Sequence, residues 1–263
     1  MGGTQRSTQG TVRGGDGRGG LGNVLSGIAV AVGFVLFLGG FVWGALVYRP
    51  YTVPTDSMMP TVLPGDRVLA QRIDGGEVRR GDVVIFTDAV WSNAPMLKRV
   101  VGVGGDTVRC CGEGGRLSVN GKELDEPYLD MVKADGSGQR SRVASETPFE
   151  VTVPEGNLFL MGDRRSASLD SRAHLQEAGQ GTVPREAVSA RIDARVWPSM
   201  VMVERPGTYA GLPGGVSAQG PLRLQVAAAV TGAFLVVAGA AYGPVARLLR
   251  RGRTGGAGAG GVG

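Results

Sequence analysis

The chain has 263 residues, an apolar fraction of 42% and a formal net charge of +5. The positive surplus lies at the two ends, since residues 1–23 carry a net +2 and residues 247–263 carry +4. Residues 49–223 hold 21 basic and 22 acidic side chains. Because the central region has no basic surplus, the overall charge gives no support to a nucleic-acid-binding protein.

The N-terminal part of the chain predicts a tail followed by a membrane span. Residues 1–23 are rich in glycine and lack aromatic side chains, so they cannot bury enough apolar surface to fold and we expect disorder. Residues 24–47 contain no charge and exceed the roughly 20 residues that cross a bilayer. They also exceed the roughly 7–15-residue apolar core of a cleaved signal peptide. We therefore expect a retained anchor.

A second apolar segment, residues 226–246, lies near the C-terminus. It contains Thr231 and Pro244 and is rich in alanine and glycine, so its insertion is weaker and a buried helix of a soluble domain is the alternative. Residues 247–263 are basic and then glycine-rich, and we expect a second disordered tail. Positive charge just outside both spans predicts that both termini are cytoplasmic and that residues 48–221 lie outside the cytoplasm. Contact of the basic tails with anionic lipid or nucleic acid is the alternative.

The central region, residues 48–221, predicts one substantial domain or a core with an inserted lobe, and it is mostly β. Short apolar runs are separated by turn residues and show little helical periodicity. Asn120-Gly121 predicts a hairpin, because this pair supplies the positive φ angles of a type I′ turn. Residues 130–147 are polar and predict a mobile loop. The expected strands are residues 66–70, 82–86, 97–103, 116–119, 122–124, 149–153 and 157–161.

Two adjacent cysteines, Cys110 and Cys111, lie within this region. If the region is exported, they are either structural thiols or a bridge between neighbours, which is an uncommon geometry. We expect no metal site here, because two adjacent thiols and one distant histidine lack the ligand spacing of a zinc site.

Ser57 is a candidate nucleophile in the run Pro54–Pro60, a few residues after the first span. Taken alone, it is better explained as a turn serine that caps a backbone group. A catalytic serine needs a base, and the chain offers its single histidine, His174, or Lys98. Burial among apolar neighbours would lower the pKa of Lys98 from about 10.4, although most strand lysines are exposed. Lys98 and Arg99 point to opposite faces of a strand, so one can be buried while the other stays solvated.

Three stretches are more specific than any single residue. They are residues 54–61 (PTDSMMPT), 98–106 (KRVVGVGGD) and 162–172 (GDRRSASLDSR), and residues 81–84 (GDVV) add a weaker match. In this order they resemble the bacterial type I signal peptidases, membrane-anchored Ser/Lys proteases that remove signal peptides from exported proteins. The resemblance covers about residues 24–198. The family usually has asparagine after Gly-Asp, where this chain has arginine at position 164.

The resemblance implies an antiparallel β-sheet peptidase domain with an inserted β lobe at about residues 107–155, flanked by one N-terminal and one C-terminal transmembrane helix. It implies a serine endopeptidase that removes N-terminal signal peptides at the outer membrane surface, after small residues in an Ala-X-Ala pattern. Ser57 would be the nucleophile and Lys98 the general base. Its partners would be the signal peptides of preproteins, membrane lipid and the export translocase, with no nucleic acid. No metal or organic cofactor is implied.

The same resemblance assigns roles around this dyad. The Thr55 hydroxyl and the Ser57 backbone N–H would form the oxyanion hole. Ser168 would hydrogen-bond the Lys98 amine and hold its orientation. The supporting residues would include Asp163 and an Asp170–Arg172 ion pair, for which a polar turn with a surface salt bridge is the alternative. Shallow apolar pockets for the substrate would be lined by Val53, Met58, Val62, Met96 and Leu97.

Two other classes of protein share part of this pattern. A Ser/Lys self-cleaving repressor would share the dyad, but the two spans and the lack of a DNA-binding segment argue against it. A catalytically inert, membrane-anchored binding or assembly protein would share the topology. His174 has no spacing that pairs it with Ser57, so we expect an incidental loop residue rather than a catalytic base.

Overall fold

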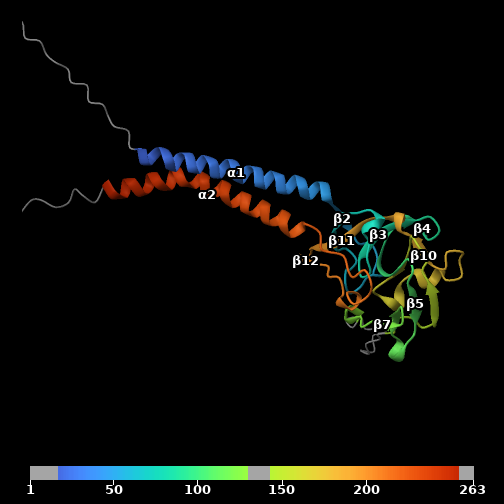
Figure 1. Cartoon of the computed structure of the whole chain (residues 1–263). Coiled ribbons are helices and arrows are strands. Elements are labelled where there is room, and N and C mark those ends of the chain that lie inside the picture. The colour runs from blue at the N-terminus through green and yellow to red at the C-terminus, as the bar shows by residue number, and fades with distance from the viewer. Residues whose placement is uncertain (1–16, 130–142, 255–263) are drawn as a thin grey trace, which may run out of the picture. The chain divides into compact units, whose positions relative to one another are not determined.

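The computed structural model describes residues 17–129 and 143–254. The chain divides into two units (Figure 1). One unit contains the two long helices, and the other, Ala45–Leu222, contains the strands.

The helical unit consists of α1 (Gly17–Val47) and α2 (Leu222–Thr254). Both are long and apolar enough to cross a membrane, over Gly22–Val47 and Leu222–Ala246. These segments overlap the two spans predicted from the sequence. The expected fold, a mostly β domain with an apolar helix at each end, is therefore confirmed.

Both helices extend further than the sequence predicted. Residues 17–23, expected to be disordered, form the start of α1, and α2 continues through residues 247–254 of the expected tail. Once a helix is nucleated, each added residue gains one hydrogen bond, and arginine is a good helix former. Residues 1–16 and 255–263 of the expected tails lie outside the described residues.

The larger sheet of the second unit has eight strands in the order β1-β2-β11-β3-β4-β9-β10, with β12 paired to β11. All of these pairs are antiparallel. The strands are β1 (Tyr48–Thr52), β2 (Arg67–Arg72), β3 (Val83–Asp88), β4 (Ser92–Val103), β9 (Asn157–Met161), β10 (Thr182–Pro184), β11 (Val188–Trp197) and β12 (Val201–Met202).

The smaller sheet is the inserted lobe, in the order β7-β6-β5-β8. Its strands are β5 (Thr107–Cys110), β6 (Leu117–Val119), β7 (Lys122–Glu123) and β8 (Phe149–Thr152). Asn120 and Gly121 both have positive φ, so the predicted hairpin is present between β6 and β7. Cys110 and Cys111 are joined by a disulfide. Of the expected mobile loop, residues 130–142 lie outside the described residues.

The two sheets share one apolar core. It contains lobe residues such as Val108 and Leu117 together with Phe159 of β9. Tyr209 and Leu212, which come from the segment between β12 and α2, complete the same cluster. The lobe is therefore packed on the larger sheet and is closed by residues from the end of the domain.

Candidate active site

The centre of the site is a direct contact between Ser57 and Lys98. Ser57 lies in the turn between β1 and β2, and Lys98 lies on the central strand β4, where it pairs with Val84 of β3. Lys98 Nζ donates a hydrogen bond of 2.8 Å to Ser57 Oγ. Both residues are buried, with 7% and 6% of their surface exposed. The two residues predicted as a dyad are thus in hydrogen-bond contact, in a position protected from bulk water.

The environment of Lys98 favours the neutral amine. Burial is the largest influence and lowers the pKa of Lys98 below its ordinary value. The Asp170 carboxylate opposes this by raising the pKa, Arg172 lowers it, and Asp163 raises it. Because burial prevails, a larger fraction of Lys98 can accept a proton at neutral pH than of an exposed lysine.

The hydroxyls expected around the dyad differ in what they contact. Thr55 Oγ1 lies 3.4 Å from Ser57 Oγ, on the same turn. Ser168 Oγ is buried and makes no hydrogen bond to the Lys98 amine among the described residues; its hydroxyl faces Asp170 and helps to lower the pKa of that carboxyl. The Lys98 amine is instead directed at Ser57 Oγ. The Ser168 side chain packs against Gly162, which explains its position in the wall of the site.

Arg99 is not solvated, contrary to the expectation that one of the two basic side chains stays in water. Only 1% of its surface is exposed. Its guanidinium donates to both carboxylate oxygens of Asp163, at 2.8 and 2.7 Å, and to the Gly81 carbonyl. Thr61 also donates to Asp163. A cation on the opposite face of β4 can thus be buried because a bidentate carboxylate neutralises it.

The expected ion pair between Asp170 and Arg172 is present and buried. Arg172 donates from Nε and from one terminal nitrogen, at 2.8 and 2.7 Å, and the Asp170 side chain is fully buried. Burial alone raises the pKa of Asp170, but the hydrogen bond and charge of Arg172 outweigh it and lower that pKa. Asp170 also accepts from the Gly162 N–H at 2.9 Å. This pair is therefore part of the packed site and not a surface salt bridge.

Arg164, the departure from the family pattern, does contact the turn that carries Ser57. Its backbone N–H donates to the Ser57 carbonyl at 3.0 Å. Its side chain forms an ion pair with Asp56. The turn that carries Ser57 and the turn after β9 are thus joined by a main-chain and a side-chain contact.

An apolar groove of about 540 Å³ leads to the dyad. Of the five predicted substrate-binding residues, Val53, Met96 and Leu97 line it. Met58 and Val62 are not among the residues that line it, and their side chains pack in the buried core cluster beneath. The sequence did not single out the other apolar residues of the lining, which are Tyr51, Pro54, Val68, Ile85, Pro95, Ala167 and Leu169.

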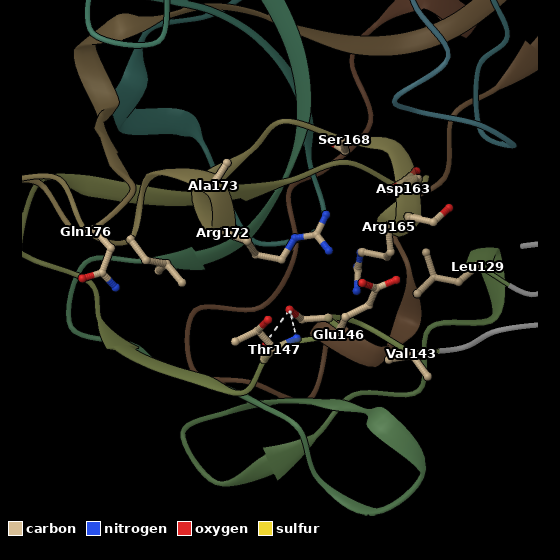
Figure 2. Close-up of a pocket in the computed structure, with 13 residues that line it drawn as sticks. Leu129, Val143, Glu146, Thr147, Asp163, Arg165, Ser168, Arg172, Ala173 and Gln176 are labelled. Atoms are coloured by element: carbon tan, nitrogen blue, oxygen red, sulfur yellow. Dashed lines mark hydrogen bonds between the residues drawn. The ribbon is translucent and has the colours of Figure 1, made fainter.

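A second, more polar cavity of about 650 Å³ shares the segment after β9 with the groove. Ala167 and Leu169 line the groove, whereas Ser168 and Arg172 line this cavity. Figure 2 shows the Arg165 and Arg172 side chains within it. The segment from Ala167 to Arg172 therefore separates the apolar groove from the polar cavity.

His174 lies outside this arrangement. Its ring stacks on Trp91, with 4.4 Å between ring centres, and Nδ1 lies 2.7 Å from a Glu177 carboxylate oxygen. These contacts support the prediction that His174 is incidental to the Ser57 site.

Two residues of this region were missed as site residues by the sequence reasoning. Gly162 was noted only as part of a motif, yet its backbone lies against Ser57 and Ser168. Arg165 is buried against Glu126, although it reads as an ordinary charged turn residue. The one available signal was a second arginine directly after Gly-Asp-Arg in the 162–172 stretch.

The sequence is similar to those of known proteins. Residues 22–197 match the family described as signal peptidase, peptidase S26, which makes the chain a membrane-anchored peptidase of the serine type. It belongs to the signal peptidase family.

Individual relatives cover much of the chain. Signal peptidase IB of Staphylococcus aureus (strain Mu50 / ATCC 700699) is 33% identical over 180 residues, 65% of this chain and 87% of the relative. Signal peptidase I of Mycobacterium tuberculosis (strain CDC 1551 / Oshkosh) is 33% identical over 219 residues, 66% of this chain and 71% of the relative. A crystal structure of a signal peptidase I from Enterococcus faecalis V583 is 29% identical and has a TM-score of 0.35, with 43% of this chain and 94% of that chain covered.

Proposed function

We propose that this peptidase removes N-terminal signal peptides from exported preproteins by a Ser/Lys mechanism. The observation that carries the proposal is the 2.8 Å hydrogen bond from a buried Lys98 to Ser57 Oγ. Burial supplies the lowered pKa that a lysine needs in order to act as a base.

The chemistry follows from these two groups. Neutral Lys98 takes the proton of Ser57 as Ser57 Oγ bonds to the scissile carbonyl carbon, which gives a tetrahedral oxyanion. Thr55 Oγ1 and the Ser57 N–H would donate to that oxygen. Collapse breaks the C–N bond, and the Lys98 ammonium returns its proton to the leaving amine. A water molecule, deprotonated by Lys98, then hydrolyses the acyl-enzyme ester and frees Ser57.

The groove supports a preference for small side chains before the cut. Val53, Met96 and Leu97 give it apolar walls beside Ser57, and such walls favour an extended peptide with small apolar residues. An Ala-X-Ala pattern fits this lining. The two helices and the basic ends of the chain support a location at the membrane with the peptidase unit outside the cytoplasm, near membrane lipid and the export translocase.

The proposal is tested by cleavage of a preprotein with an Ala-X-Ala site by the full chain in detergent. Ser57→Ala and Lys98→Ala are expected to abolish cleavage, and Thr55→Val to lower kcat roughly 100-fold, because one oxyanion donor is lost. His174→Ala and Lys122→Ala are matched controls and should cut at the wild-type rate. Full activity of Lys98→Ala contradicts the dyad. If no variant and no wild-type sample cuts, the inert binding protein becomes the better explanation.

A further inference from the structure

A buried ion pair, Glu126 with Arg165, supports the turn that follows β9. Arg165 donates to the two carboxylate oxygens of Glu126 at 2.9 and 2.6 Å, and only 6% and 5% of the two side chains are exposed. Arg165 Nε also donates to the Gly162 carbonyl at 3.1 Å. One guanidinium therefore connects Glu126 to the peptide at Gly162.

The Gly162 turn lies directly against the nucleophile. A Cβ atom built on Gly162 would lie 2.6 Å from the Ser57 carbonyl oxygen and 2.2 Å from Ser168 Oγ. Arg164, two positions further along the turn, donates its N–H to the same Ser57 carbonyl. Because the Gly162 backbone leaves no room for a side chain here and Arg164 is hydrogen-bonded to Ser57, we expect a shift of the turn to move the Ser57 backbone.

Glu126 is itself held by two buried tyrosines. The Tyr128 hydroxyl donates to Glu126, and the Tyr209 hydroxyl lies 3.3 Å from the same carboxylate oxygen. The Tyr128 ring also lies under Arg99, whose Cζ is 4.3 Å from the ring centre. Arg99 follows Lys98 in β4. The cluster of Glu126, Arg165, Tyr128 and Tyr209 thus contacts Gly162, which lies against Ser57, and Arg99, which follows Lys98.

We propose that Glu126 is a positioning residue, which fixes Arg165 and through it the Gly162 turn and the Ser57 backbone. Tyr209 lies between β12 and α2, so the segment that leads to the second helix contributes to the support of the site. Glu126 does not line the substrate groove. The proposal rests on the proposed function and adds the group that sets the geometry of its nucleophile.

Two substitutions separate this role from a general contribution to stability. Glu126→Gln keeps the shape of the side chain but removes the charge that pairs with Arg165. Arg165→Lys keeps a positive charge beside Glu126. A single ammonium group, however, cannot replace the three guanidinium nitrogens that bind both Glu126 oxygens and the Gly162 carbonyl. Both variants should lower kcat roughly 10- to 100-fold with KM within about twofold, because a small displacement of a nucleophile slows the chemical step.

Asp106→Asn is the matched control. Asp106 forms a bidentate pair with Arg80 that is as deeply buried as the Glu126–Arg165 pair, and within residues 17–129 and 143–254 no hydrogen bond or ion pair joins it to the Gly162 turn. All three variants should lose thermal stability, but Asp106→Asn should keep the wild-type kcat. If Glu126→Gln does not fold, the kcat of Arg165→Lys tests the positioning role by itself.

Amide hydrogen exchange gives a readout that does not depend on cleavage. Glu126→Gln and Arg165→Lys should speed the exchange of the Gly162 and Arg164 amides by about tenfold, and Asp106→Asn should not. The proposal is overturned if both variants keep kcat and these exchange rates within twofold of wild type, or if Asp106→Asn reproduces their loss. A wild type that cleaves nothing contradicts the proposed function, and the exchange rates still decide the role of Glu126.

Discussion

Nearby charges of opposite sign influence the pKa of Lys98 in addition to burial. Burial lowers its pKa, Asp170 raises it and Arg172 lowers it. A general base must be neutral to act, so kcat should rise with pH through the pKa of Lys98, at a pH below the ordinary lysine value. The two members of one ion pair therefore influence the pKa of Lys98 in opposite directions.

We expect the acidic limb of the pH–kcat profile to move in opposite directions in two variants. Asp170→Asn removes the charge that raises the pKa of Lys98 and leaves Arg172, so the limb should move to lower pH. Arg172→Gln leaves Asp170, so the limb should move to higher pH. The measurement is kcat on a peptide substrate across pH for both variants, with circular dichroism as the check on folding. Shifts in the same direction would mean that Lys98 is not the titrating group.

At the scale of secondary-structure elements, the turn after β9 is packed so closely that it has no space for a side chain at Gly162. Gly162→Ala would place a methyl group 2.2 Å from Ser168 Oγ and 2.6 Å from the Ser57 carbonyl oxygen. Overpacking of this kind costs about 1–3 kcal/mol, and relief by movement of Ser57 should lower kcat roughly 100-fold.

Gly207→Ala is the control for this change, because a methyl group there meets no atom within 4 Å. We expect it to keep kcat and the melting temperature of the wild type. If Gly162→Ala keeps kcat within twofold, the turn can yield without moving Ser57 and its role in the site is smaller than inferred.

The sequence predicted those elements that are marked by a short apolar run or by a specific turn pair. The strands at 82–86 and 157–161 and the Asn120-Gly121 turn were found within a residue or two. It missed β11, because Arg191 and Asp193 interrupt its apolar run. Their charges are tolerated inside the domain because partners on other segments neutralise them: Arg205 pairs with Asp193, and Asp82 pairs with Arg191.

In the site, too, residues in local sequence motifs could be predicted, and residues held by contacts between distant segments could not. The contact between Ser57 and Lys98 could be predicted because each residue lies in a specific local stretch, although 41 positions separate them. Glu126 could not, since its partner Arg165 is 39 positions away and no spacing rule joins them. Met58 and Val62 were misplaced because an apolar residue near a groove and one beneath it look alike in sequence.

At the scale of the whole molecule, the distribution of charge predicts one topology. The two terminal segments carry net charges of +2 and +4, whereas the region between the spans carries no positive surplus. Because positive charge holds a loop on the cytoplasmic side, both ends should be cytoplasmic and the peptidase unit outside.

Single cysteines test this topology in a Cys110→Ser, Cys111→Ser background. In cells with a permeabilised outer barrier, a membrane-impermeant maleimide should label Val90→Cys, which is at an exposed position of the peptidase unit. It should label Gly10→Cys and Gly260→Cys only after detergent is added. Labelling of either terminal cysteine before detergent places that end outside and contradicts the predicted orientation.

The core of the inserted lobe has a consequence for the order of events during biogenesis. Val108 and Leu117 of the lobe pack with Tyr209 and Leu212, which are made about a hundred residues later. A chain that emerges from its N-terminus cannot complete this core until the residues just before the second helix have followed. We therefore infer that the domain completes its fold only when nearly all of the chain has been synthesised, so an unfinished copy has an open lobe and lacks the contact of Tyr209 with Glu126.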